Sequence, residues 1–265
     1  MSRKIVAIGG GENGGLRGDG TRKPYETGPM DREIVRLAEK EHPHFLFLGH
    51  AVPPEVQEGY FQTMKSVYEK LGCSCRDLKS RDLFEKDRVR SLVEWADIIY
   101  EGGGNTLDMI ALWKDSGLDV LLRDAWDRGT VLCGVSAGAN CWFRKCSSDS
   151  LQIKYGEDQP LIGMDCLGFA EGFFVPHCDE PGRKESVKEL LKEDGGTGIL
   201  VSNCCALEIV DDRYRLLVSD GSRYQIRPYA QKAFWQGNQY LESPLDDTPE
   251  WKPLEDLQSR ENRHF

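Results

Sequence analysis

The chain has 265 residues, of which 39% are hydrophobic and 29% are charged, and 34 Lys and Arg against 44 Asp and Glu give a net charge of −10. This is the composition of a folded globular protein rather than a disordered one. The acidic balance argues against a general nucleic-acid binder and against binding to an anionic membrane surface, because both need clustered Lys and Arg.

The nine cysteines are odd in number, and none of their spacings forms the paired C-x-x-C units of a zinc site. We therefore expect reduced, mostly buried thiols and no metal. Near the N-terminus, residues 5–8 are apolar and glycines follow, which is too short for a targeting or membrane-spanning segment. We expect a cytoplasmic protein.

Short apolar runs alternate with amphipathic stretches in the first half of the chain, a pattern typical of βαβ units around a mostly parallel sheet. The expected strands are residues 4–8, 45–48, 73–78, 97–100 and 130–133. The expected helices are residues 31–40, 54–71, 86–95, 106–114 and 119–128.

The pattern changes after residue 139. A polar stretch over residues 145–160 precedes an apolar run at 168–176 and a helix over 183–192. Two apolar runs, 207–210 and 214–218, flank Asp211-Asp212-Arg213 and predict a β-hairpin. We expect one α/β domain over residues 1–243 and a polar C-terminal tail over residues 244–265.

The segment Gly134-Val135-Ser136-Ala137-Gly138 is a G-x-S-x-G motif at the point where the fifth expected strand meets a helix. Such a turn lifts a serine hydroxyl clear of the sheet, and the small flanking residues leave room for a substrate. The N–H group after the serine can face a developing oxyanion. Ser136 is therefore the candidate nucleophile, although a small-residue turn without chemistry has the same pattern.

A nucleophilic serine needs a base, because its hydroxyl is not reactive at neutral pH. His177 follows the apolar run Phe173-Phe174-Val175-Pro176, at the end of an expected strand, where catalytic groups gather in parallel sheets. His50 closes the second expected strand and is a weaker candidate. The other histidines are His42 and His44, before a strand, and His264, in the tail.

An acid should complete the set by orienting the imidazole. Asp149 lies in a polar loop between Ser136 and His177, Glu208 lies on the expected hairpin, and Asp179 and Glu180 directly follow the histidine. The spacing does not choose between them.

Two glycine clusters follow other strands. Gly102-Gly103-Gly104-Asn105-Thr106 opens a helix, and its backbone N–H groups could supply a second oxyanion donor. Gly9-Gly10-Gly11-Glu12-Asn13-Gly14 fits the dinucleotide-binding pattern G-x-G-x-x-G, but helical periodicity begins only near Asp31. Phosphate would not meet a helix N-terminus there, so we do not expect a dinucleotide.

Together these motifs resemble the peptidase E family, serine peptidase family S51, which includes the cyanophycinases and has a class I glutamine-amidotransferase-like fold. The resemblance runs from Lys4 to about Val218 and rests on residues 8–12, 102–106, 134–140 and 176–177. It implies a mostly parallel central sheet flanked by helices, with a C-terminal β-hairpin. It also implies a dipeptidase-like serine peptidase that hydrolyses short peptides, with N-terminal Asp-X dipeptides as the specific case.

The resemblance carries roles onto matching positions. Ser136 matches the nucleophile, His177 the general base and Asp149 the acid. The oxyanion hole would come from the backbone N–H groups of Gly103 or Gly104 and of Ala137. Residues expected to bind substrate are Asn105 and Arg183, the latter as the cation for an aspartyl side chain.

This chain departs from some relatives at the hairpin entry, where they carry an acid and it has Ser202-Asn203-Cys204. If that position orients the base, Asn203 would serve, as an asparagine does in cysteine peptidases, with Glu208 as the substitute. The acids after His177 are expected to raise its pKa or to repel an acidic substrate.

The leading hypothesis is a serine peptidase that works through an acyl-enzyme on a small peptide, without a cofactor, nucleic acid or membrane. The sequence is also compatible with a homodimer. One alternative is a glutamine amidotransferase-like amidase, which would need a cysteine where Ser136 stands. Another is a catalytically silent member that binds a metabolite or peptide.

Overall fold

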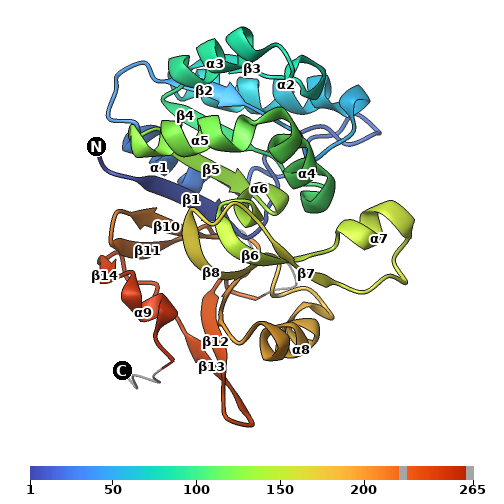
Figure 1. Ribbon diagram of the computed structural model, residues 1–265. Coiled ribbons are helices and arrows are strands. Elements are labelled where there is room, and N and C mark those ends of the chain that lie inside the picture. The colour runs from blue at the N-terminus through green and yellow to red at the C-terminus, as the bar shows by residue number, and fades with distance from the viewer. Residues whose placement is uncertain (221–225, 261–265) are drawn as a thin grey trace.

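Two β-sheets and the helices around them make up the described part of the chain, residues 1–220 and 226–260, in a computed structural model (Figure 1). The strands of the first sheet are β1 (Lys4–Ile8), β2 (His44–Phe47), β3 (Ser74–Asp77), β4 (Ile98–Glu101), β5 (Val131–Val135), β10 (Cys205–Val210), β11 (Arg213–Val218) and β14 (Lys252–Pro253). Their order is β14-β11-β10-β1-β5-β4-β2-β3.

The middle of this sheet is parallel. Strands β1, β5, β4, β2 and β3 pair parallel in that order, while β10, β11 and β14 are added antiparallel. The helices that connect the parallel strands are α1 (Gly28–Leu37), α2 (Pro54–Lys70), α3 (Lys86–Trp95), α4 (Thr106–Ser116) and α5 (Leu118–Asp127). The strands and helices predicted for this half are thereby confirmed, with bounds shifted by up to three residues.

Alternating side chains of these strands supply two cores. Leu46, Ile99 and Leu132 belong to one buried apolar cluster, and their neighbours Phe45 and Ile98 belong to another. Burial on both faces explains the continuous apolar runs in the sequence, because parallel strands covered by helices on both sides have no solvent-facing side.

The second sheet was not predicted. Its strands are β6 (Phe143–Ser148), β7 (Ile162–Asp165), β8 (Ala170–Val175), β9 (Thr197–Val201), β12 (Ala230–Gln236) and β13 (Gln239–Pro244), in the order β13-β12-β9-β8-β6-β7. The polar stretch 145–160, for which no regular element was predicted, contains most of β6 and helix α7 (Ser150–Tyr155). Arg144 and Lys145 of β6 both form ion pairs with Asp194 at the end of helix α8 (Arg183–Asp194), so polar residues are accommodated in a strand.

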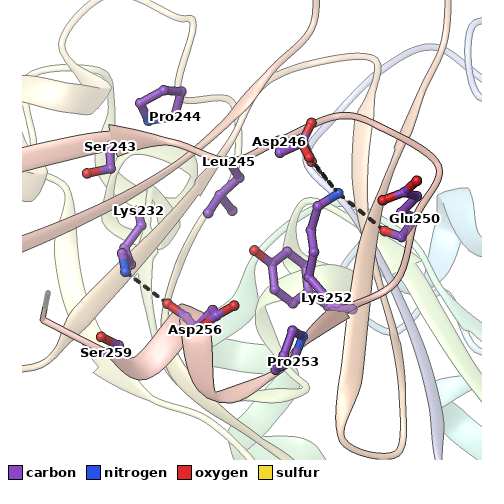
Figure 2. Close-up of a pocket in the computed structure, with 11 residues that line it drawn as sticks. Lys232, Ser243, Pro244, Leu245, Asp246, Glu250, Lys252, Pro253, Asp256 and Ser259 are labelled. Atoms are coloured by element: carbon purple, nitrogen blue, oxygen red, sulfur yellow. Dashed lines mark hydrogen bonds and ion pairs between the residues drawn. The ribbon is translucent and has the colours of Figure 1, made fainter. Parts of the chain in front are cut away.

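The segment 244–260 packs against both sheets. Strand β14 pairs with β11, and helix α9 (Glu255–Gln258) buries Leu257 and contacts β8 and β9. A cavity of about 260 Å³ lies at this segment, where Lys232 donates to the carbonyl oxygen of Asp256 and Lys252 approaches Asp246 (Figure 2). None of the predicted site residues lines it.

Candidate active site

Strand ends from both sheets meet at the predicted catalytic residues. Ser136 directly follows β5, and His177 lies two residues beyond β8. The end of β1 holds both backbones, because the N–H of Ser136 donates to the carbonyl of Ile8 (3.0 Å) and that of His177 to the carbonyl of Gly9 (3.1 Å). The predicted nucleophile and base therefore both hydrogen-bond to the end of β1, through the consecutive residues Ile8 and Gly9.

Ser136 has a strained backbone, with φ 56° and ψ −113°, directly before the short helix α6 (Ala137–Asn140). His177 (φ 52°) and Cys204 (φ 61°) also have positive φ, so three of the five such non-glycine residues in the described chain lie at this site. Strain of this kind costs on the order of 1–3 kcal/mol per residue and is typical of functional sites. Gly138 makes the turn sterically feasible, because a Cβ there would lie 2.1 Å from the carbonyl oxygen of Glu101.

The ring of His177 is oriented by Asn203, which lies between β9 and β10. Nδ1 of His177 lies 2.9 Å from Oδ1 of Asn203. The amide orientation is fixed, because its NH₂ group faces carboxylate oxygens of Asp179 (3.0 Å) and Glu180 (3.3 Å), which can only accept. Nδ1 of His177 must then carry the proton and donate it, and Nε2 is left as the basic nitrogen.

Burial lowers the pKa of His177 below its ordinary value, with Glu180 opposing the shift. Oε1 of Glu180 lies 3.5 Å from Nδ1. We expected the acids beside the histidine to raise its pKa, and the net direction is the opposite because desolvation of the ring outweighs their charge. His177 is therefore neutral near pH 7, as a general base must be.

Two of the acids considered for orienting His177, Asp149 and Glu208, are paired with arginines instead. Asp149 accepts from Nη2 of Arg183 at 2.7 Å, and its charge acts on His177 only over a longer distance. Glu208 lies fully buried on β10, in an ion pair with Arg215 at 2.7 Å. Among the contacts of the described residues, neither carboxylate hydrogen-bonds to His177.

The two residues expected to bind substrate are engaged within the protein. Arg183 has a side chain only 10% exposed, because Asp149 and Glu180 flank its guanidinium. Asn105 caps α4, with its Oδ1 accepting from the N–H of Asp108 and its NH₂ group donating to the carbonyl of Ser150. Asn105 thus serves the local fold in this state.

The predicted oxyanion donors surround Ser136. A Cβ built on Gly103 would lie 3.4 Å from Cβ and 3.9 Å from Oγ of Ser136, so this turn directly faces the nucleophile. The N–H of Gly103, however, donates to Oη of Tyr60 at 3.3 Å. Ala137 is the first residue of α6, where an N–H group has no acceptor within the helix.

Gly10 and Tyr60 are site residues that the sequence analysis missed. A Cβ on Gly10 would lie 2.1 Å from Oδ1 of Asn203 and 2.4 Å from Nδ1 of His177. The glycine cluster after β1 thus makes room for the histidine and its partner. The dinucleotide-like pattern at this cluster was the signal for Gly10, but nothing in the sequence marks Tyr60, which lies inside an ordinary amphipathic helix.

A groove of about 1030 Å³ adjoins the site. It lies between residues 11–16 and helix α2, and it includes both Gly11 and Tyr60. In the described residues there is no group of three His, Cys, Asp or Glu side chains placed to hold a metal ion. Within the same residues, no helix is long and apolar enough to cross a membrane.

Other candidate residues have structural roles. His50 is buried, with Nε2 donating to the carbonyl of Leu78 and Nδ1 accepting from the indole N–H of Trp113. Burial lowers its pKa to about 4. Cys133, beneath the Ser136 turn, is fully buried, and burial raises the pKa of its thiol well above the ordinary range. His264 lies outside the described residues.

Comparison of the sequence with known proteins gives matches that point to peptidases. The family model described as peptidase family S51 matches residues 15–217. A Bacillus subtilis (strain 168) protein named uncharacterized peptidase YgaJ is 32% identical over 222 residues, covering 83% of this chain and 89% of that protein. Peptidase E of Shigella flexneri serotype 5b is 27% identical over 157 residues, covering 55% of this chain and 63% of that protein.

Solved structures share the fold, and one of them illustrates the match. It is a peptidase from an acI-B1 Actinobacterium, which superposes with a TM-score of 0.68 over 96% of this chain and 97% of its own, at 17% sequence identity.

Proposed function

The chain belongs to peptidase family S51, and from this premise we propose that it hydrolyses short peptides through an acyl-enzyme formed on Ser136. The observation that carries the proposal is the His177–Asn203 hydrogen bond, which leaves Nε2 as the basic nitrogen of a histidine held beside the serine turn.

In the proposed reaction, Oγ of Ser136 attacks the peptide carbonyl while Nε2 of His177 takes the hydroxyl proton. The C–N bond then breaks, and His177 returns the proton to the leaving amine. Water repeats the sequence on the ester, which releases the acyl group and restores Ser136. No other group is consumed.

We assign the orienting role to Asn203, with Asp179 and Glu180 behind it. Two carboxylates facing the NH₂ group polarise the amide, which increases the negative charge that Oδ1 presents to the imidazolium in the transition state. Asp149 then acts mainly as the partner of Arg183. This arrangement corresponds to the asparagine alternative at the hairpin entry.

The N–H groups of Ala137 and Gly104 are the proposed backbone donors to the oxyanion. Neither N–H has a hydrogen-bond acceptor among the described contacts. Ala137 directly follows Ser136, and Gly104 directly follows Gly103, on which a Cβ would lie 3.9 Å from Oγ of Ser136. The positive end of α6 supports Ala137, although this helix has only four residues.

The proposed substrates are short peptides, with N-terminal Asp-X dipeptides as the specific case implied by the family resemblance. Arg183 is the candidate partner for an acyl-side aspartate, and it would have to exchange Asp149 for the substrate carboxylate.

We also propose that the five parallel strands correspond to the class I glutamine-amidotransferase-like sheet. Glutaminase chemistry is disfavoured because Cys133, three residues before Ser136 on β5, is fully buried and burial raises the pKa of its thiol well above the ordinary range.

The test is labelling with a fluorophosphonate followed by peptide mass spectrometry. The wild-type protein should gain one adduct, on Ser136, and the Ser136→Ala variant should gain none. A dipeptide panel with Asp-Leu and Ala-Leu then measures turnover. A folded wild-type protein that is neither labelled nor active on any peptide would refute the proposal and favour a silent binding protein.

A further inference from the structure

Tyr60 of helix α2 stands between the catalytic turn and the adjoining groove. Its hydroxyl oxygen accepts the N–H of Gly103 at 3.3 Å, and Gly103 itself faces Ser136. Among the described contacts this is the one hydrogen bond of the Tyr60 hydroxyl, and in it the hydroxyl acts only as an acceptor. The hydroxyl proton of Tyr60 is therefore free to be donated.

Packing fixes the tyrosine ring at this position. A Cβ on Gly102 would lie 2.4 Å from Cε1 of Tyr60, so the ring rests directly on the glycine turn. On another side, the ring of Phe47 meets it edge-on at 5.0 Å between centroids. The side chain is only partly buried and lines the groove, so a bound peptide can reach it.

The N–H of Gly103 donates to the hydroxyl oxygen of Tyr60, so it is not available to donate to an oxyanion at Ser136. Because Tyr60 occupies the N–H of Gly103, the tyrosine hydroxyl is the donor that this part of the turn offers to a substrate carbonyl oxygen. A hydroxyl that accepts one hydrogen bond becomes a stronger donor of another, because the two bonds polarise each other. Side-chain hydroxyls placed in this way act as oxyanion donors in acyl transfer.

We propose that Tyr60 is a catalytic residue of this peptidase, whose hydroxyl donates a hydrogen bond to the carbonyl oxygen of the substrate as that oxygen becomes negative. The inference rests on the proposed Ser136 mechanism. As the Oγ–C bond forms, the carbonyl electron pair moves to oxygen and the serine proton moves to His177. Tyr60 keeps its own proton throughout.

The electrostatics agree with a neutral hydroxyl. Burial raises the pKa of Tyr60 to about 12, and the negative charges of Glu101, Asp31 and Glu12 act in the same direction, while the N–H of Gly103 opposes them. The phenol therefore stays protonated at any pH at which His177 works as a base.

The first test is Tyr60→Phe, which removes the hydroxyl and keeps the ring. We expect kcat to fall about 10²–10³-fold, with KM changed less than threefold, because the bond forms only in the transition state. The matched control is Tyr68→Phe on the same helix, whose hydroxyl bonds Asp31 at 2.9 Å, away from the site. Its kcat should stay within threefold of wild type. A Tyr60→Phe protein with unchanged kcat, or with only a raised KM, overturns the proposal.

The nucleophile is monitored separately. Labelling of the wild-type protein by a fluorophosphonate at Ser136 supports the proposed function independently of Tyr60. If the wild-type protein is not labelled, the proposed function is refuted, and the role of Tyr60 is not what failed.

If Tyr60→Phe does not fold, site-specific replacement of Tyr60 by 2,3-difluorotyrosine keeps the shape of the side chain and lowers the pKa of the phenol. An additional loss of kcat at alkaline pH, where this phenol ionises, is expected. A pH profile identical to that of wild type overturns the proposal.

Discussion

Nδ1 of His177 donates to Oδ1 of Asn203 at 2.9 Å, while the NH₂ group of the same amide faces two carboxylates. An asparagine cannot rotate freely between these partners, because its NH₂ group would then meet the Nδ1–H of the histidine. The carboxylates therefore determine the histidine tautomer through an intervening amide rather than by direct contact.

Replacement of Asn203 should remove this control. We expect Asn203→Ala to lower kcat by about 10²–10⁴-fold with a small change in KM, because the ring loses its tautomer and orientation. Asp149→Asn should lower kcat for Ala-Leu less than tenfold. Steady-state kinetics on both variants, with thermal melts to verify folding, checks this. The reverse ranking of the two losses would restore Asp149 as the orienting residue.

The pH dependence of activity should reflect the lowered pKa of His177. The base must be neutral, so the acid limb of kcat/KM is expected to have its midpoint below pH 6.5, the ordinary value for histidine. Removing the charge of Glu180, which raises this pKa, should move the midpoint further down, by up to about one unit in Glu180→Gln.

The control is Glu171→Gln, since Glu171 is exposed on β8 and pairs with Arg144. Its profile of kcat/KM against pH should overlay that of wild type. An acid limb that moves upward in Glu180→Gln would contradict the proposed electrostatics of the site.

Substrate preference should respond to the Arg183–Asp149 ion pair. Asp149→Asn removes the closer of the two carboxylates that flank Arg183, at 2.7 Å, and makes the guanidinium more available to an aspartyl side chain. We expect the ratio of kcat/KM for Asp-Leu over Ala-Leu to rise about tenfold, equivalent to about 1.4 kcal/mol. The double variant Asp149→Asn with Arg183→Met should lose this gain. If the ratio stays constant in both variants, Arg183 does not contact the acyl-side residue.

Glu101 should make stability fall as the pH rises. It is fully buried at the end of β4, and its carboxylate accepts from the N–H groups of His50, Ala51 and Gly102. Burial raises its pKa from 4.5 to about 8. Between these values the folded protein holds a proton that the unfolded chain has released, so the folded state loses stability with increasing pH.

The measurement is urea unfolding of wild type and Glu101→Gln from pH 5 to 8.5. The variant keeps an acceptor oxygen but cannot titrate. The free energy of unfolding of wild type relative to the variant should decrease by up to about 1.4 kcal/mol per pH unit within this window. A difference that stays constant, or that increases with pH, would show that Glu101 is ionised in the folded protein.

The sequence predicts local features better than contacts between residues that are far apart along the chain. The strands and helices of the first half are readable because parallel strands give continuous apolar runs and the helices between them give regular periodicity. Ser136 and His177 stand out because each follows such a run. Asn203 is 26 residues from His177, and only the pairing of β8 with β9 brings them together. Tyr60 reaches Gly103 across 43 residues through the packing of α2, which no local pattern encodes.

Gly10 offers the sharpest steric test of the site. A methyl group there would lie 2.1 Å from Oδ1 of Asn203 and 2.4 Å from Nδ1 of His177, so Gly10→Ala must displace the pair. We expect kcat to fall at least about 10²-fold, because displacement by about 1 Å misaligns the base. The matched control is Gly18→Ala, since a Cβ on the exposed Gly18 would meet no atom within 4 Å. Its kinetics and melting temperature should equal those of wild type. A Gly10→Ala protein that folds and retains full activity would show that the His177–Asn203 contact is not needed for catalysis.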